Sequence, residues 1–188
     1  KYNQYTYTDF IDDIANSLPQ YDFNHQLDDI AGYDLIFLTF DNGTADIRNN
    51  AALAADVIRW IDSTKVPNNN NGNIIEQNVV MGLSMGGLVA RYALAKMTKA
   101  GENTGTRLLI THDSPHQGAN VPLGLQYFIR MLGNFQLFGT NVTDIFPEYN
   151  QVIGLFTAPA TQQLLIYTST GTNTYAANTF LNNDYRNM

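Results

Sequence analysis

In the middle of the chain, apolar runs of strand length alternate with amphipathic segments of helix length. The runs at 33–40, 78–83 and 107–112 are rich in residues that favour β-structure, and their continuity is typical of strands covered on both faces. The segments at 45–62 and 85–97 place apolar side chains at helical spacing. Such an alternation predicts a mostly parallel sheet flanked by helices, which is an α/β fold.

The flanking sequence gives weaker signals. Thr44 is a predicted N-cap for the first of these helices, and further helices are expected at 9–17 and at 158–167, the latter with a proline in its first turn. The Asn-rich stretch at 67–72 predicts a surface loop. The tail from Thr168 is polar and predicts no strong element.

The composition fits a single domain and excludes several classes of function. The chain has 188 residues, of which 44% are hydrophobic and 14% charged, so one core is expected and disorder is not. A net charge of −7 argues against a nucleic-acid partner, because phosphate contacts need a basic face. No transmembrane segment is expected, and the lack of cysteine excludes disulfides and thiolate metal sites. A composition rich in Asn, Thr and Tyr suggests a secreted or cell-surface bacterial protein.

The joint between the second strand and the helix after it carries one serine among small residues. The run Gly82-Leu83-Ser84-Met85-Gly86 fits G-x-S-x-G, the nucleophile elbow, in the strand–turn–helix context that this motif requires. The tight turn is expected to strain Ser84 and to lift its hydroxyl above the sheet edge, with glycine needed at 82 and 86 to avoid collisions. At the helix N-terminus, the Met85 N–H is expected to face a developing oxyanion.

Three stretches resemble one family. "GLSMGGLVARYAL" (82–94) resembles the elbow and following helix of α/β-hydrolases of the lipase and esterase type, and its Gly87 is expected to let the helix pack closely on the sheet. "LLITHDSPHQGANVPLG" (108–124) is similar to the next strand and loop, and "GYDLIFLTFDNGTADIRNNA" (32–51) to the preceding strand and helix of a bacterial subgroup. The resemblance implies an α/β-hydrolase domain over 1–188 that needs no cofactor.

The resemblance also implies a triad in the chain order serine, acid, histidine. Asp113 follows the third strand at the carboxyl edge of the sheet and is the candidate acid. Its alternative role is to hydrogen-bond the backbone of the turn at 114–118. Asp144 and Asp184 are later alternatives, although nothing around them is distinctive.

The histidine of the triad is harder to place, although the chain has three. His25 precedes Ser84 in a polar stretch, His112 ends a strand, and His116 lies in an S-P-H-Q-G run whose histidine usually has a structural role in the family. No histidine follows His116. Two explanations stay open. The first is that the chain is incomplete, and that the last strands with the catalytic histidine lie beyond Met188. The second is that the chain has no further histidine to supply, so that either His116 or His112 acts as the base or the protein is catalytically silent.

Residues 121–138 carry many large apolar side chains and few charges. As a mobile lid over the serine they would suit a lipid-like acyl substrate. A core helix explains the same pattern equally well. In either case Tyr127, Phe128, Phe135 and Phe138 are candidates to line an acyl pocket.

The leading hypothesis is a serine hydrolase that cleaves small-molecule or lipid carboxylic esters through an acyl-enzyme on Ser84. The S-P-H-Q-G-A loop and the apolar segment 121–138 favour a lipase or esterase among the many chemistries of this elbow. The alternative is a catalytically silent hydrolase-fold protein that acts as a binding or assembly component. A nucleotide-binding sheet is disfavoured, since the glycines lack the G-x-G-x-x-G arrangement and no Walker lysine follows.

Overall fold

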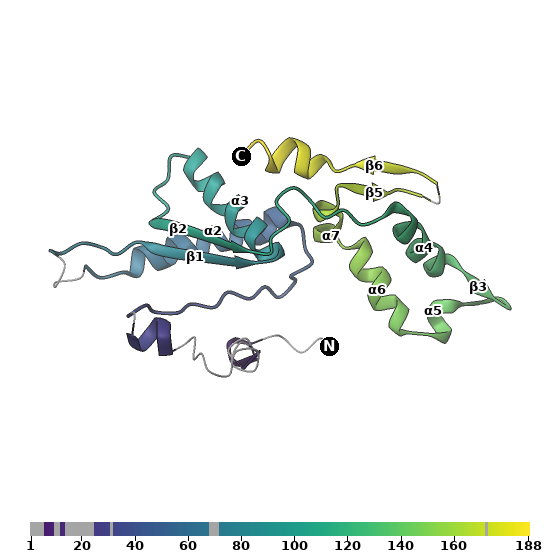
Figure 1. Ribbon diagram of the computed structural model, residues 1–188, viewed down its shortest axis with the longest axis horizontal. Coiled ribbons are helices and arrows are strands. Elements are labelled where there is room, and N and C mark those ends of the chain that lie inside the picture. Colours follow the sequence, from purple (N-terminus) through teal and green to yellow (C-terminus); the bar gives the residue numbers. More distant parts are fainter. Residues whose placement is uncertain (1–5, 10–11, 14–24, 31, 68–71, 172) are drawn as a thin grey trace. The chain divides into compact units, whose positions relative to one another are not determined.

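The computed structural model describes residues 6–9, 12–13, 25–30, 32–67, 72–171 and 173–188. The chain divides into two compact units, Lys1–Gly43 and Thr44–Met188 (Figure 1). In the first unit, residues 7–9 and 12–13 are helical and η1 (His25–Ile30) is a short π-helix. Much of the helix predicted at 9–17, and of the loop predicted at 67–72, lies outside the described residues.

The strand predicted at 33–40 is wrong. Residues 32–40 carry no strand, and a turn follows at 41–44. The Tyr33 N–H donates instead to the Leu27 carbonyl of η1 at 2.9 Å. A strand exists only through a hydrogen-bonded neighbour, and an apolar run by itself does not supply one.

The second unit contains a two-stranded parallel sheet at the positions of the other two predicted strands. It consists of β1 (Asn78–Leu83) and β2 (Thr106–His112). The register pairs the last residues of the two strands, Leu83 and His112. The residues that follow each strand, Ser84 and Asp113, therefore leave the sheet at the same edge.

Helices lie on one face of this sheet, which confirms the predicted α/β fold. α3 (Met85–Lys99) contacts both strands, and α2 (Ile47–Thr64) packs on α3 (Figure 1). The N-cap of α2 is Asp46, whose carboxylate accepts a hydrogen bond from the Arg48 N–H at 2.8 Å. The predicted N-cap, Thr44, is therefore wrong, because the helix begins at Ile47 and the residue directly before it supplies the capping carboxylate.

Side chains of the two helices form the main core. The buried residues of α2 and α3 include Ile47, Ala51, Ala54, Ile58, Leu88, Tyr92, Ala93 and Met97. On the sheet, α3 covers the face that carries Gly82 and Thr111. The other face leaves Met81 49% and Ile110 40% exposed, so the prediction of strands covered on both faces is wrong for the described chain. The reason is that α2 packs mainly on α3 and not on the second face of the sheet.

A group of small elements follows the loop after β2. They are α4 (Leu123–Asn134), the hairpin of β3 (Gln136–Leu137) and β4 (Thr140–Asn141), α5 (Val142–Ile145) and α6 (Glu148–Thr157). α4 packs against both α5 and α6. The predicted helix at 158–167 is present as α7 (Pro159–Leu164), with its proline at the first position as expected.

The tail contains regular elements that its polar sequence did not predict. β5 (Tyr167–Ser169) and β6 (Tyr175–Ala177) form an antiparallel pair, and η3 (Phe180–Tyr185) is a short π-helix. The expectation of no strong element after Thr168 is therefore wrong. The prediction failed because it relied on the small number of apolar residues in the tail. Three of these residues, Phe180, Leu181 and Tyr185, are nevertheless buried and hold η3 in place.

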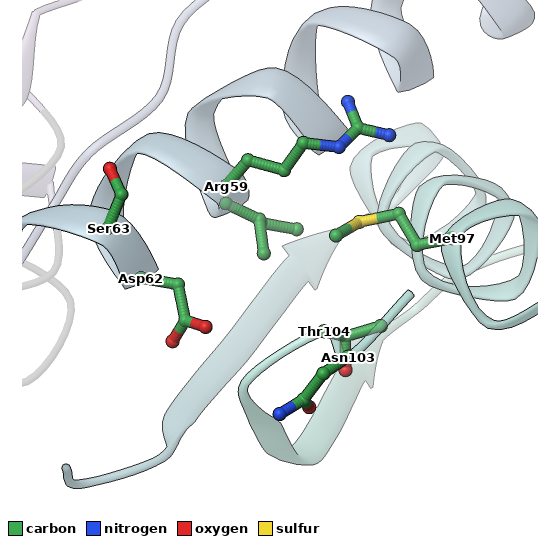
Figure 2. A pocket seen from close by; sticks show the side chains of 7 residues that line it. Arg59, Asp62, Ser63, Met97, Asn103 and Thr104 are labelled. Carbon is green, nitrogen blue, oxygen red and sulfur yellow. The ribbon is translucent and has the colours of Figure 1, made fainter. Parts of the chain in front are cut away.

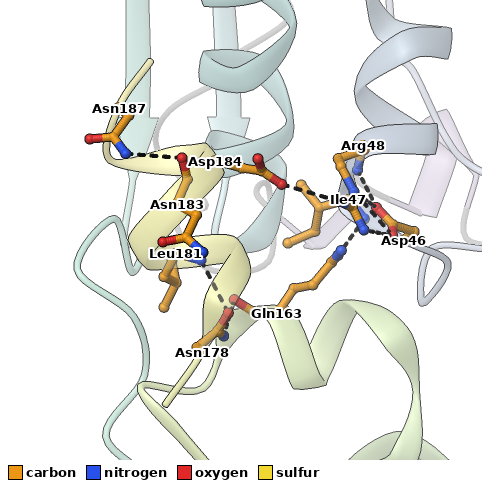
Figure 3. A network of polar contacts seen from close by, with 9 residues as sticks. All are labelled: Asp46, Ile47, Arg48, Gln163, Asn178, Leu181, Asn183, Asp184 and Asn187. Atoms are coloured by element: carbon orange, nitrogen blue, oxygen red, sulfur yellow. Dashed lines mark hydrogen bonds and ion pairs between the residues drawn. The ribbon is translucent and has the colours of Figure 1, made fainter.

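A polar network ties this tail to the start of α2 (Figure 3). The buried Asn178 donates through Nδ2 to the carbonyls of Gln163 at 2.7 Å and Leu165 at 2.6 Å. The Gln163 side chain in turn accepts from the Ile47 N–H at 2.7 Å. Arg48 bridges the carboxylates of Asp46 and Asp184, so that α2, α7 and η3 are joined by charged and neutral hydrogen bonds.

Candidate active site

Ser84 occupies the joint between β1 and α3 in a strained backbone conformation. Its φ of 48° and ψ of −121° lie outside the regions that L-residues favour, at a typical cost of about 1–3 kcal/mol. The Ser84 N–H donates to the His112 carbonyl at 2.8 Å, and the Ser84 carbonyl accepts from the Gly87 N–H at 3.1 Å. The expected strain is therefore present and is held by hydrogen bonds on both sides, while the role of Ser84 as nucleophile stays a prediction.

The glycines around Ser84 differ in what they contribute. A Cβ at residue 82 would lie 2.5 Å from the Gly86 carbonyl oxygen and 2.5 Å from the Gly87 Cα. A Cβ at residue 86 would meet nothing within 4 Å, so the collision predicted there is wrong and only one side of the turn is crowded. A Cβ at residue 87 would lie 3.1 Å from that of Thr111, which confirms the predicted close approach of helix and sheet.

Ser84 is an exposed residue, and its hydroxyl is not used to cap α3. Met85 is the first residue of that helix, so its N–H has no intrahelical acceptor. The helix N-terminus also carries a partial positive charge that favours anions. A hydroxyl beside such an N–H is chemically suited to attack on a carbonyl group.

Asp113 is the counterpart of Ser84 on the neighbouring strand. It directly follows β2, is exposed, and has a φ of 47°, which is also unusual for a residue with a side chain. The turn at 114–118 is closed by main-chain bonds from His116 to Ser114 and from Gly118 to Pro115, each 2.8 Å long. Neither bond involves the Asp113 carboxylate. These two bonds therefore do not support the alternative role of Asp113, in which its side chain holds the turn.

His116 is held at both ring nitrogens. Nδ1 lies 2.5 Å from the Tyr185 hydroxyl and Nε2 lies 3.0 Å from the Thr111 hydroxyl, while the ring stacks on that of Tyr185. Burial, together with the nearby Arg91 guanidinium, lowers the pKa of His116 below its ordinary value of 6.5, so the imidazole is neutral at pH 7. To accept the Ser84 proton, this ring would have to give up one of its two hydrogen bonds.

The other two histidines occupy different places. His112 ends β2 opposite Leu83 and is exposed, so it lies on the strand next to Ser84. His25 begins η1 in the unit Lys1–Gly43. The structure therefore brings His112 and His116 to the sheet edge that carries Ser84 and Asp113.

The later candidate acids both have structural partners. Asp184 of η3 pairs with Arg48 at 3.1 Å. Asp144 of α5 accepts from the Asn141 side chain at 3.3 Å. Neither acid directly follows a strand of the β1–β2 sheet, and Asp113 therefore stays the stronger candidate.

A cavity of about 240 Å³ lies away from these residues (Figure 2). It is lined by Arg59 and Asp62 of α2, Met97 of α3, and Asn103 and Thr104 of the loop that leads into β2. This loop lies at the amino end of β2, whereas Ser84 and Asp113 follow the carboxyl ends of the strands. Ligands of parallel sheets bind at the carboxyl ends, so the cavity is not the candidate active site. The four aromatic candidates of the 121–138 segment are not among its lining residues.

Sequence reasoning missed the partners of His116. Tyr185 is fully buried, and the Arg91 guanidinium carbon lies 4.6 Å from the centre of its ring. The contact between His116 and Tyr185 joins residues 69 positions apart, and no local pattern in the sequence marks such a pair.

Comparison with known proteins gives a family match over the middle of the chain. The sequence model of the PGAP1-like alpha/beta domain matches residues 33–146, a range that includes Ser84, Asp113 and His116. No curated protein and no solved structure gives a match. Within the described residues, every helix is too short or too polar to cross a bilayer. Because the match spans more than half of the sequence, the chain belongs to the PGAP1-like alpha/beta domain family, an α/β-hydrolase-like family.

Proposed function

We propose that the chain is a serine hydrolase that cleaves carboxylic esters, with Ser84 as nucleophile. The observation that carries the proposal is the strained Ser84, which stands exposed between β1 and α3 with a hydroxyl that does not cap the helix. A fold keeps such strain only where the surrounding structure enforces it, and strained residues of this kind cluster at functional sites. Membership of a hydrolase-like family supports the same reaction class.

The proposed reaction proceeds through an acyl-enzyme. The Ser84 oxygen attacks the ester carbonyl, and its proton passes to a base. The carbonyl oxygen becomes an oxyanion that accepts a hydrogen bond from the Met85 N–H. Collapse of the tetrahedral intermediate expels the alcohol, which takes a proton, and water then releases the acid from Ser84.

The proposal assigns Asp113 as the acid that orients the base. Asp113 follows the strand paired with β1, so its backbone lies beside that of Ser84. His116 is a poor base in this arrangement, because both of its ring nitrogens are engaged. Within the chain, the proposal therefore takes His112 as the candidate base, because it ends β2 beside the Ser84 turn.

A second candidate function is that of a catalytically silent binding or assembly component. It is favoured by one observation: both ring nitrogens of His116 are engaged, one with the Tyr185 hydroxyl and one with the Thr111 hydroxyl. The substrate range of an active enzyme would decide between an esterase for small molecules and a lipase for long acyl chains.

The test is labelling with a fluorophosphonate, followed by mapping of the adduct by mass spectrometry. The wild-type chain is compared with Ser84→Ala and with Ser63→Ala, a matched control at an exposed serine whose hydroxyl bonds to the Trp60 carbonyl on α2. Labelling at Ser84 that is lost only in Ser84→Ala would support the hydrolase, and hydrolysis of p-nitrophenyl esters of increasing acyl length would then define its class. A folded chain that carries no label would overturn the hydrolase and leave the binding component.

A further inference from the structure

Asp113 is strained, and the β1–β2 sheet holds only one of its two sides. Its φ of 47° lies in the left-handed region, which is costly for a residue with a side chain. Before it, His112 ends β2, and the His112 carbonyl accepts from the Ser84 N–H at 2.8 Å. After it comes the loop 114–119, which has left this sheet. A strained residue keeps its conformation only where its surroundings enforce it, so the contacts of this loop matter for Asp113.

Two polar contacts from η3 and the residue after it hold this loop. The Tyr185 hydroxyl lies 2.5 Å from Nδ1 of His116. The Arg186 guanidinium donates through Nη2 to the Gln117 carbonyl at 3.0 Å. Tyr185 is fully buried, whereas the contact of Arg186 lies at the surface. Two adjacent residues therefore bind two adjacent residues of the loop, and they hold both a side chain and the main chain.

The next two loop residues are held by packing and by a main-chain bond. Gly118 has a φ of 91°, and a Cβ at this position would lie 2.5 Å from Cδ1 of Leu181 in η3. The Ala119 N–H donates to the Leu164 carbonyl of α7 at 2.7 Å. The Leu181 N–H in turn donates to the side chain of Asn178 at 3.1 Å (Figure 3). Each residue from 116 to 119 is thus in contact with η3, the residue after it, or α7.

η3 is itself anchored on α3, the helix that follows the Ser84 turn. The Arg91 guanidinium carbon lies 4.6 Å from the centre of the Tyr185 ring. Lys99, at the end of α3, donates through Nζ to the Asn187 carbonyl at 3.0 Å. The π-helix therefore links the helix after the nucleophile elbow to the loop after β2, and it has a fixed support from which to hold that loop.

We propose that Tyr185 and Arg186 position Asp113 for catalysis, by holding the loop 114–119 so that Asp113 keeps its positive φ. Asp113 is the group that would act in the reaction, whereas Tyr185 and Arg186 are positioning residues that act through the loop. The catalytic consequence rests on the proposed hydrolase function, but the hold on the backbone of Asp113 does not. A misplacement of about 1 Å at a group of this kind can slow a reaction about 100-fold.

The first experiment measures the strain at residue 113 by urea unfolding of Asp113→Gly and Asp113→Ala. Glycine accepts a positive φ freely and alanine does not, so Asp113→Gly should have the higher urea midpoint. The gap between the two midpoints should narrow when the pair is made together with Arg186→Ala. It should narrow further when Tyr185→Phe is added, because residue 113 can then relax to a negative φ, where glycine has no advantage.

Lys99→Ala is the matched control for Arg186→Ala. Each change removes one cation and one hydrogen bond of 3.0 Å to a main-chain carbonyl, but the Lys99 bond joins the tail to α3 and not to the loop. In the Lys99→Ala chain the midpoint gap should equal that of the parent. The proposal is overturned if the gap is unchanged in the Tyr185→Phe, Arg186→Ala chain, or if Lys99→Ala narrows it as much as Arg186→Ala does.

The second experiment measures the rate of fluorophosphonate labelling at Ser84. Arg186→Ala should slow labelling about tenfold or more, and Arg186→Lys, which keeps a cationic donor, should restore most of the rate. With a p-nitrophenyl ester, kcat should fall while KM stays, because no contact with the substrate is removed. The acidic limb of the rate–pH profile should move to lower pH, since a displaced carboxylate no longer raises the pKa of the base.

The two experiments separate this proposal from the hydrolase function. If the wild-type chain carries no label, the hydrolase function is wrong, and the urea midpoints still decide whether the loop holds Asp113. If Ser84 is labelled at the same rate and with the same pH profile in wild type and Arg186→Ala, the hydrolase stands and the positioning role is overturned. A loss of folded protein alone would leave the pH profile of the remaining enzyme unchanged, which would also count against positioning.

Discussion

The Ser84 N–H donates to the His112 carbonyl at 2.8 Å, one residue beyond the last pair of the parallel sheet. The bond continues the ladder into the residue where β1 turns into α3. It also fixes Ser84 beside Asp113, the next residue of the neighbouring strand. Both residues have positive φ, near 48°, so the two chains leave the sheet through strained joints that lie side by side.

The first prediction concerns the crowded side of the Ser84 turn. Gly82→Ala should lower the free energy of unfolding by about 2 kcal/mol or more, because its Cβ would press on main-chain atoms that cannot turn aside. Gly86→Ala is the matched control. Its Cβ meets open space inside a helix, where alanine is favoured by up to about 1 kcal/mol over glycine. Urea unfolding of both variants checks the pair, and equal destabilisation would contradict the described turn.

The second prediction concerns the neutral His116. Its pKa is lowered in the folded state, first by burial and then by Arg91, so the unfolded chain binds the proton more readily. The stability that His116 contributes is therefore complete above about pH 6.5 and is lost as the pH falls through the lower, folded pKa. The difference in free energy of unfolding between wild type and His116→Gln should shrink or reverse between neutral and acidic pH. A difference that is constant over this range would mean that His116 titrates alike in both states.

A further prediction concerns Tyr185, whose hydroxyl contacts Nδ1 of His116. Tyr185→Phe keeps the buried ring and removes the hydroxyl that lies 2.5 Å from Nδ1. Loss of this hydrogen bond should cost about 1 kcal/mol. It should also free one ring nitrogen of His116. If His116 is a latent base, fluorophosphonate labelling of Ser84 should rise in Tyr185→Phe; if its role is structural, labelling should stay unchanged or fall.

The features that could be predicted from the sequence are those that depend on residues close together in the chain. The order of β1, α3 and β2 follows from apolar periodicity, and the place of Ser84 follows from glycines within two residues of it. The strand expected at 33–40 fails because an apolar run does not specify a hydrogen-bonding neighbour. The buried Tyr185 was missed because it lies in polar sequence and meets His116 across 69 positions. Such contacts depend on how the elements pack, which local periodicity does not encode.

The third prediction concerns the start of α2. The pKa of Asp46 is strongly lowered, chiefly by its hydrogen bonds with Arg48, and its carboxylate caps the helix. Asp46→Ala should cost about 1–2 kcal/mol, whereas Asp184→Asn, at a carboxylate 42% exposed, should cost less than about 0.5 kcal/mol. Because the folded pKa is depressed, the contribution of Asp46 is complete above about pH 4 and is lost below it. Urea unfolding at pH 7 and pH 3 checks both the size and the pH dependence, and an Asp46→Ala penalty that survives unchanged at pH 3 would count against the charged cap.

The last prediction concerns the buried amide that anchors the tail. Asn178 donates through Nδ2 to the carbonyls of Gln162, Gln163 and Leu165 within 2.6–2.8 Å, and its Oδ1 accepts from the Leu181 N–H at 3.1 Å. Asn178→Asp would place a carboxylate oxygen against three carbonyl oxygens in a site where Asn178 is 6% exposed. The carboxyl must then take up a proton or remain charged and unpaired, and the free energy of unfolding should fall by about 3 kcal/mol or more.

The control is the same change on the exposed side of η3. Asn182 accepts a hydrogen bond from the Arg186 guanidinium at 2.7 Å, so Asn182→Asp strengthens that contact and should change stability by less than about 0.5 kcal/mol. For Asn178→Asp, the loss should become smaller at acidic pH, because protonation restores one donor to the buried group. Thermal unfolding of the two variants at pH 7 and pH 4 separates a buried carboxylate from a general weakness of the tail. A pH-independent loss, or an equal loss in Asn182→Asp, would mean that the tail is not held by the Asn178 amide.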